Sequence, residues 1–208
     1  MTRFKLMCLV IAISFFAACA KDGEFRLINL TNHNVYYSID KNDYILEGNE
    51  ERSHDLSTDK KTMFSEGNKH YKVKIEGETF VLVDGEDEVT ETTITIKPDK
   101  TLKAYLHPNR ASLRLVNDSD MMISSLYYKQ NFEAHQNFSS ELIEDPIVPG
   151  DSTWFRLPAS QMNPDNPGYF YYTFELRDET GRVYFFGNSS TVLDVDQQYR
   201  LKFEGLQE

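Results

Sequence analysis

Hydrophobic and polar residues alternate along most of this 208-residue chain. The alternation is clearest at residues 71–75, 93–96 and 102–106, where apolar side chains recur at every second position. A period of two is typical of a β-strand that packs one face on a core and turns the other face to water. Long stretches with the spacing of an amphipathic helix are missing from the sequence. The pattern therefore predicts an all-β protein.

The second half of the sequence repeats, in the same order, the features of the first half. Residues 26–29 and 114–117 share the pattern Arg-Leu-(Ile or Val)-Asn, and each is followed by a pair of tyrosines. Each half offers about seven short strands separated by turn residues, which is the pattern expected of an immunoglobulin-like sandwich. We expect two tandem immunoglobulin-like antiparallel β-sandwich domains. The alternative is chance similarity, because any two strand-rich segments resemble each other.

Several turn residues are interpreted as structural. Asn29 and Asn117 end the first strand of each half, where an Asn side chain can bond nearby backbone and help turn the chain. Gly48 and Gly150 mark matching turns, at a position that we expect to need a positive φ angle. The acidic run at residues 84–88 contains an Asp-Gly step that is typical of a tight hairpin. A calcium site is the alternative for this run.

The N-terminal residues have the order of a secretory signal. Arg3 and Lys5 precede an almost purely apolar run over residues 6–18, which is too short to span a bilayer as a helix. The end of this run, Phe16-Ala17-Ala18-Cys19, resembles the lipobox of bacterial lipoproteins, whose cysteine becomes the acylated first residue of the mature protein. The resemblance implies lipid attachment at Cys19. An ordinary signal peptide cut elsewhere is the alternative.

The cysteine content fits this interpretation. Cys8 lies in the segment to be removed, so Cys19 has no partner for a disulfide in an oxidising compartment. Residues 20–24 resemble the charged signals that follow the lipidated cysteine in surface-exported lipoproteins of the Bacteroides group, and a solvated linker is the alternative. The predicted location is the outer membrane, with a lipid-anchored body that is periplasmic or surface-exposed.

The predicted organisation has four parts. Residues 1–18 are the lipoprotein signal peptide, and residues 19–24 are the lipidated cysteine and a linker. Residues 25–108 form the first β-sandwich domain, and residues 109–208 form the second, an internal repeat of the first. Few residues separate the last strand of one half from the first strand of the next. We therefore expect the two domains to be closely coupled.

The chain is acidic, with a formal net charge of −11, or −13 once Arg3 and Lys5 leave with the signal peptide. Such a surface repels nucleic acid and anionic headgroups. We expect contact with the membrane through the N-terminal lipid and no nucleic-acid partner. A glycan or another protein remains as the candidate partner.

Residues that could carry catalysis lack the partners that catalysis needs. Gly150-Asp151-Ser152 resembles the nucleophile block of the Gly-Asp-Ser esterases, in which the catalytic His follows the serine; here the last histidine, His135, precedes it. The five histidines contain no pair at metal-ligand spacing, and no thiol is available to complete a zinc site. We therefore expect no enzyme, no catalytic residue, no metal site and no cofactor.

One candidate binding face follows from the alternation in the second half. If the odd-numbered residues of 153–157 point into the core, Trp154 and Arg156 point outward. The same logic buries the even-numbered residues of 170–176 and leaves Tyr169 and Tyr171 on the solvent side. Sugars stack on aromatic faces, and Trp, Tyr and Arg dominate protein hot spots. These four residues form the predicted ligand or partner face; packing of Trp154 against the other domain is the alternative.

These features favour a non-catalytic, membrane-anchored binding or accessory module at the cell envelope, with a glycan or protein ligand. The first domain would serve as a spacer that lifts the second from the membrane. The architecture resembles that of small tandem-sandwich surface lipoproteins of glycan-uptake systems. The alternative is a structural component of an envelope assembly or pilus, for which an unpaired edge strand would be the expected sign.

Overall fold

The computed structural model describes residues 21–62, 64–131, 141–161, 163 and 165–205. The predictions for the signal peptide, Cys19 and His135 lie outside these described residues. Within the described ranges, no helix is long and apolar enough to cross a membrane.

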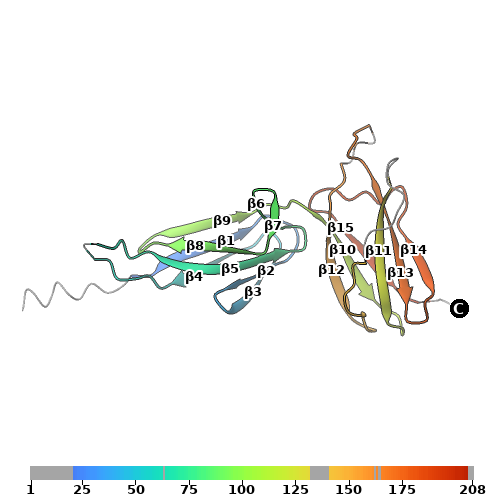
Figure 1. Ribbon diagram of the computed structural model, residues 1–208, viewed down its shortest axis with the longest axis horizontal. Helices are drawn as coiled ribbons and strands as arrows, with labels where there is room; N and C mark the ends of the chain where they lie inside the picture. The colour runs from blue at the N-terminus through green and yellow to red at the C-terminus, as the bar shows by residue number, and fades with distance from the viewer. Residues whose placement is uncertain (1–20, 63, 132–140, 162, 164, 206–208) are drawn as a thin grey trace, which may run out of the picture.

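The prediction of an all-β sandwich fold is confirmed, and the strands fall into two groups (Figure 1). The first half contains β1 (Gly23–Asn29), β2 (Val35–Ile39), β3 (Asn42–Leu46), β4 (Glu51–Leu56), β5 (Lys69–Gly77), β6 (Leu82–Asp84), β7 (Asp87–Val89), β8 (Glu91–Ile96) and β9 (Thr101–Leu106). The second half contains β10 (Ala111–Asn117), β11 (Ile123–Asn131), β12 (Ser152–Leu157), β13 (Tyr171–Asp178), β14 (Val183–Phe186) and β15 (Gln198–Phe203).

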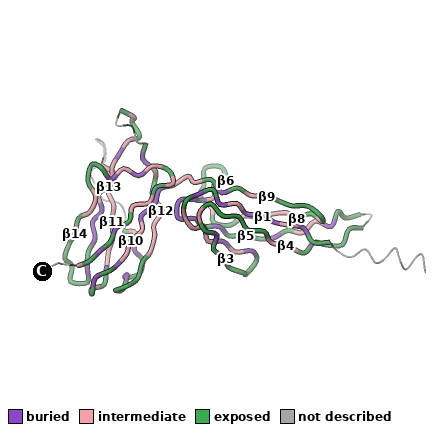
Figure 2. Tube along the Cα trace, turned by 180° about the vertical axis from the view of Figure 1, so that it is seen from behind, coloured by how far each residue is buried: buried purple, intermediate pink, exposed green. Residues whose placement is uncertain are grey.

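The first half buries its core between two sheets. One sheet has the strand order β4-β1-β9 and the other β3-β2-β5-β8, while β6 and β7 form a separate hairpin. Alternate residues of these strands are buried and form one cluster that includes Phe25, Leu27, Val35, Val73 and Ile96 (Figure 2). The period of two in the sequence therefore supplies one apolar face to each sheet.

The second half repeats this arrangement with sheets β12-β10-β15 and β11-β13-β14. Its separate buried cluster includes Leu113, Leu115, Tyr172, Phe174 and Phe203. In Figure 1 the strands of the second half run across the long axis along which the strands of the first half lie.

The strand directions differ in one respect from the antiparallel expectation. β1 pairs antiparallel with β4 but parallel with β9, and β10 pairs antiparallel with β12 but parallel with β15. In the first half, the chain passes from β8 in one sheet to β9 in the other, so the last strand returns alongside the first in the same direction. Each half is therefore a mixed sandwich whose first strand is central in its sheet.

The two asparagines act as predicted. The buried Asn29 amide donates to the carbonyl oxygens of His33 (2.8 Å) and Glu47 (2.9 Å). Asn117 does the same to the carbonyls of Met121 (2.8 Å) and Ile147 (2.9 Å). Each side chain therefore ties the end of the first strand to later segments of its own half.

The prediction for the paired glycines is correct for Gly150 and wrong for Gly48. Gly150 has φ +85°, whereas the positive φ of the first turn falls on Asn49, at 61°. The backbone nitrogens of Asn29 and Asn117 bond Glu50 and Asp151, respectively, so Asn49 is the counterpart of Gly150. Gly48 is required for another reason, because a Cβ there would lie 2.5 Å from the backbone of Asn32.

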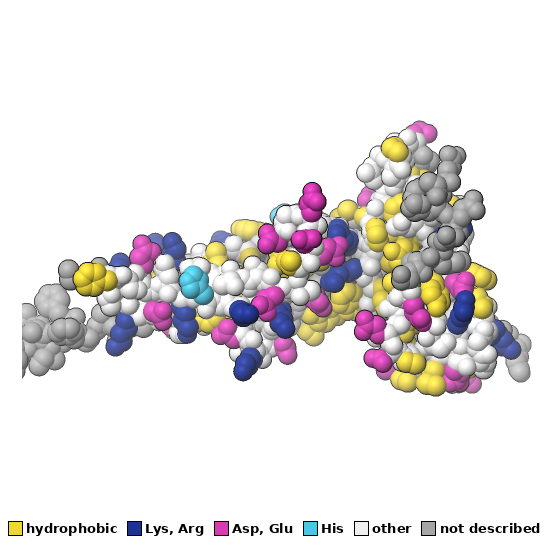
Figure 3. Space-filling model, viewed as in Figure 1, with side chains coloured by type: hydrophobic (Ala, Val, Ile, Leu, Met, Phe, Trp, Pro, Cys, Tyr) yellow, Lys and Arg dark blue, Asp and Glu magenta, His cyan; other side chains and the backbone are white. Residues whose placement is uncertain are grey.

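The acidic run forms the predicted hairpin. Asp84 pairs with Asp87 across the turn, and Gly85 has φ +66°. In the described residues, no three His, Cys, Asp or Glu side chains group closely enough to hold a metal ion. Acidic and basic side chains are interspersed on the face seen in Figure 3.

Candidate functional site

A short linker joins the halves and is fixed to the first half. Its residue Asn109 exchanges two hydrogen bonds with the backbone of Val81, at 3.0 and 2.9 Å. The backbone nitrogens of Asn109 and Arg110 both donate to the carbonyl of Thr79, at 3.0 Å each. The start of β10 is therefore anchored on the loop between β5 and β6.

Asp196, in the loop before β15, ties the second half back to the first. Its carboxylate accepts hydrogen bonds from the backbone nitrogen (3.0 Å) and side-chain nitrogen (2.7 Å) of Asn32 and from the Thr79 hydroxyl (2.7 Å). The His33 Nε2 lies 3.0 Å from the Asp196 carbonyl oxygen. Asp196 has a left-handed φ of 67°. This conformation is unfavourable for most residues, but Asp tolerates it.

Glu78 is a buried carboxylate at this junction, with a side chain that is 5% exposed. It accepts hydrogen bonds from the Tyr36 hydroxyl (3.2 Å) and from Gln198 Nε2 (2.7 Å), and Arg114 Nη1 lies 3.5 Å away. A buried charge is tolerated when it is paired and hydrogen-bonded. Here the partners come from both halves, so the charge favours one arrangement of the halves.

A polar cavity of about 410 Å³ lies at the junction, and both His33 and Ser152 line it. The Ser152 hydroxyl accepts a hydrogen bond from Arg114 Nη2 at 2.9 Å. No hydrogen bond within the described ranges joins an imidazole to this hydroxyl, and His33 is engaged by Asp196. In the Gly-Asp-Ser sequence, Gly150 lies in a turn with φ +85°, and Ser152 is the first residue of β12.

The structure brings two of the four predicted face residues together. The Trp154 ring stacks on Tyr36 of the first half, with centroids 5.9 Å apart and planes at 5°. The Arg156 guanidinium lies 5.6 Å from the Trp154 ring centroid, and its buried Nη1 has no hydrogen-bond partner among the described residues. Both side chains are half-buried on the outer face of β12. Trp154 therefore packs between the halves.

Tyr169 and Tyr171 do not join this pair. Tyr171 lies on β13 and pairs with Asn131 of β11, in the other sheet of the second half. Tyr169 precedes the same strand, and both tyrosines are half-buried. The outer faces of the two sheets of a sandwich point in opposite directions. The sequence pattern could not show that these positions lie on different sheets.

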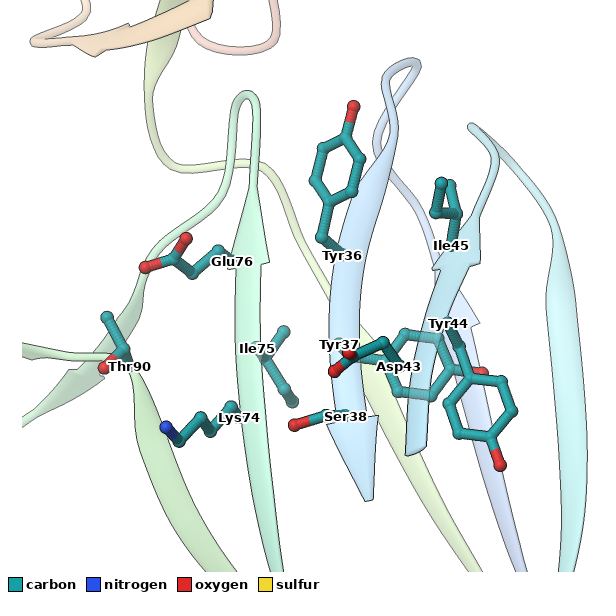
Figure 4. Close-up of a pocket in the computed structure, with 10 residues that line it drawn as sticks. All are labelled: Tyr36, Tyr37, Ser38, Asp43, Tyr44, Ile45, Lys74, Ile75, Glu76 and Thr90. Carbon is teal, nitrogen blue, oxygen red and sulfur yellow. The ribbon is translucent and has the colours of Figure 1, made fainter. Parts of the chain in front are cut away.

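An open groove lies on the outer face of the β3-β2-β5-β8 sheet (Figure 4). Its volume is about 640 Å³. Outward residues of three strands line it, together with Thr90 between β7 and β8. We call this set the groove: Tyr36 and Ser38 of β2, Asp43 and Ile45 of β3, Lys74 and Glu76 of β5, and Thr90.

The groove combines apolar surface with groups that form hydrogen bonds. Ile45 is 51% exposed, which places a branched apolar side chain in water on a folded sheet. The groove also contains two carboxylates, one ammonium group and three hydroxyls, one of them the Tyr36 phenol. Tyr36 lines the groove and also stacks on Trp154, so the groove reaches the junction. Sequence analysis did not single out the groove, because alternation does not show that Ile45 pairs with Tyr36 on a neighbouring strand.

Comparison with known proteins gives distant likeness in structure alone. No family model matches the chain, and no curated protein matches it. A DUF3823 family protein from Bacteroides ovatus shares 8% identity, with 83% of this chain and 98% of that chain covered and a TM-score of 0.27.

Two further similar structures are fimbrial proteins. The tip fimbrial protein Mfa3 from Porphyromonas gingivalis is 9% identical, covering 90% of this chain and 96% of that chain, with a TM-score of 0.34. A fimbrial assembly protein from Parabacteroides distasonis is 12% identical, covering 88% and 90%, with a TM-score of 0.31. Likeness at this level carries no conclusion about ligands or assembly.

Proposed function

We propose that this chain is a non-catalytic, lipid-anchored protein of the cell envelope that binds a glycan or a protein through the groove. The observation that carries the proposal is an open groove of about 640 Å³ in which exposed Ile45 and the Tyr36 ring stand among hydroxyl and charged groups. Apolar surface with a few polar groups is the usual composition of a binding site.

The anchor is the diacylated Cys19, with residues 1–18 removed. Several acyl chains hold a soluble body at a membrane stably, whereas one chain holds it marginally. In this proposal residues 25–108 and 109–208 are duplicated sandwich domains, and the body is attached to the outer membrane. Mass spectrometry of the membrane-purified protein tests the anchor, because an N-terminal acylated cysteine has a characteristic added mass.

A binding role fits the groove better than a catalytic one. Catalysis of acyl or glycosyl transfer needs a nucleophile, or an acid and base, held together in a closed site. The groove is open, and no hydrogen bond in the described part of the chain joins its Asp43, Lys74 or Glu76 to a hydroxyl of the groove. These charges can instead orient a ligand that lies across the strands.

Binding is tested with a glycan array and with pull-down from envelope extracts, which separate the two ligand classes. The variant Ile45→Asp places a charge in the groove and should abolish capture of the ligand. The matched control is Tyr105→Ser on β9, which changes another exposed side chain (54%) on the opposite sheet of the same half. Equal binding by Ile45→Asp and wild type would exclude the groove.

A structural role in an envelope assembly is the second candidate, and one observation favours it. In the described part of the chain β14 pairs with β13 alone, so it forms an edge of its sheet, and Val183 on it is 40% exposed. Exposed edges are sites of strand addition. A Val183→Lys substitution should then block incorporation into assemblies on cells while leaving ligand capture by the groove intact.

A further inference from the structure

A loop at the end of the first half carries Phe64 almost fully in water. We call residues 58–62 and 64–67 the basal loop. Phe64 is 97% exposed, a larger fraction than for any other large hydrophobic side chain in the described residues. Leaving an aromatic ring in water forgoes the stabilisation that burial gives. A single exposed apolar side chain is common on a folded protein, so the surroundings of Phe64 decide whether it marks an interaction site.

The basal loop is built by hydrogen bonds that hold this ring outward. Asp59 N donates to Gly67 O (3.0 Å), and Thr62 and Ser65 form an antiparallel bridge. The backbone nitrogen of Phe64 donates to the Thr62 hydroxyl at 3.2 Å. Gly67 has φ +77°, and a Cβ there would lie 2.5 Å from the Asp59 carbonyl oxygen. The exposure of Phe64 therefore follows from a closed turn.

The basal loop lies at the end where the N-terminal segment leaves the fold. The Thr58 hydroxyl donates to the carbonyl oxygen of Lys21, the first described residue. Figure 1 shows this loop at the end of the first half farthest from the second half, and Figure 3 shows apolar surface there. In the sequence, Cys19 precedes Lys21 by two residues.

The charge of this end differs from that of the whole chain. Its three segments, residues 21–22, 59–66 and 97–100, contain five lysines and four acidic residues. One acidic group, Asp99, is paired with Lys21 at 3.0 Å. The chain as a whole has a net charge of −11. The basal end therefore lacks the excess of acidic groups that the chain as a whole carries, and Lys60 and Lys61 are exposed in the same loop as Phe64.

We propose that the basal loop docks on the lipid surface that holds the anchor. Phe64 enters the interfacial layer, where aromatic side chains are favoured, while Lys60 and Lys61 contact anionic headgroups. This proposal rests on the lipid anchor at Cys19. Together, the anchor and the basal loop give two attachment points at one end of the first half. Because both points lie at that end, the first half projects from the membrane surface. The groove and the second half then remain in water.

The test uses the full chain, exported, processed and reconstituted in vesicles of phosphatidylethanolamine and phosphatidylglycerol. Phe64→Cys is labelled with a polarity-sensitive fluorophore, and quenching by spin-labelled lipid is measured. Acylated Cys19 has no free thiol, so the label reports position 64 alone. The control is Val183→Cys on β14, at the other end of the molecule. We expect blue-shifted emission and quenching at position 64, neither at position 183, and loss of the position-64 signal with Lys60→Glu and Lys61→Glu.

Three outcomes would overturn the docking. A label at position 64 that stays water-exposed while the protein floats with the vesicles excludes docking and leaves the anchor intact. A label that is water-exposed on vesicles but shielded on intact cells assigns the basal loop to a protein partner instead. Protein that does not float, with fluorophore also on Cys19, excludes the anchor and therefore the docking that rests on it.

Discussion

At the scale of single residues, His54 is a titratable group within the packing of the first half. Its Nε2 lies 2.7 Å from the Tyr37 hydroxyl, and its ring lies 4.6 Å from that of Tyr44. Burial, followed by the nearby charge of Arg52, lowers the pKa of His54 below its ordinary value of 6.5. Neutral His54 is therefore the form that the folded state accommodates.

The sign of the pH dependence follows from this shift. The unfolded chain binds a proton at His54 more readily than the folded chain, so this contribution to stability is complete above pH 6.5 and is lost as the pH falls toward the lowered pKa. We expect the free energy of unfolding in urea to fall below pH 6.5, and to fall less in His54→Gln. An unchanged slope in that variant would assign the pH dependence to other groups.

Tyr172 provides a second test at this scale. Its side chain is fully buried, its hydroxyl donates to the Pro158 carbonyl, and burial raises the pKa of the phenol well above 10. Tyr172→Phe should leave that carbonyl without its donor and lower the free energy of unfolding by about 1–2 kcal/mol. Urea denaturation measures the change. Tyr171→Phe, on the outward side of the same strand, should have little effect.

At the scale of elements, the matching turns of the two halves use glycine for different reasons. Gly150 adopts φ +85° with open space around its Cα, whereas Gly48 is limited by the Asn32 backbone, 2.5 Å from where a Cβ would lie. One turn needs a backbone conformation, and the other needs the absence of a side chain.

A matched pair of substitutions separates these causes. Gly150→Ala should lower the free energy of unfolding by about 1–2 kcal/mol, which is the usual penalty for a side chain in the left-handed region. Gly48→Ala should cost more, because the methyl group meets backbone that cannot move without disturbing the Asn29 hydrogen bonds to His33 and Glu47. Thermal unfolding of the two variants compares them. A smaller loss for Gly48→Ala would show that the turn relaxes freely.

The alternation in the sequence was sufficient for the fold class and for several strands. The pattern at residues 102–106 lies within β9, for example, because alternation reports directly which side chains meet a core. Alternation does not report strand direction, so the parallel pairing of β1 with β9 could not be predicted. It also does not report which sheet a strand joins. Trp154 and Tyr171 were therefore grouped on one face, although β12 and β13 belong to different sheets.

At the scale of the whole molecule, the groove and the junction share a residue. Tyr36 lines the groove, stacks on Trp154 and donates to the buried Glu78 carboxylate. A ligand that moves the Tyr36 ring therefore changes the contacts that fix the second half. If the affinity of the ligand depends on the arrangement of the halves, binding of the ligand must also shift that arrangement.

Asp196→Gly tests how firmly the halves are coupled. Glycine accepts φ 67° without strain, so the substitution removes only the carboxylate and its bonds to Asn32 and Thr79. We expect the free energy that holds the two halves together to fall by about 1–2 kcal/mol, which is the contribution of a few hydrogen bonds. Spin labels at Lys100 and Glu179, one in each half, should then show a broader distance distribution. Asp194→Gly is the control, because its carboxylate bonds Val195 within the same loop. A distribution unchanged by Asp196→Gly would mean that the remaining contacts, which include Glu78, the Trp154 stack and the linker hydrogen bonds, are sufficient to fix the arrangement.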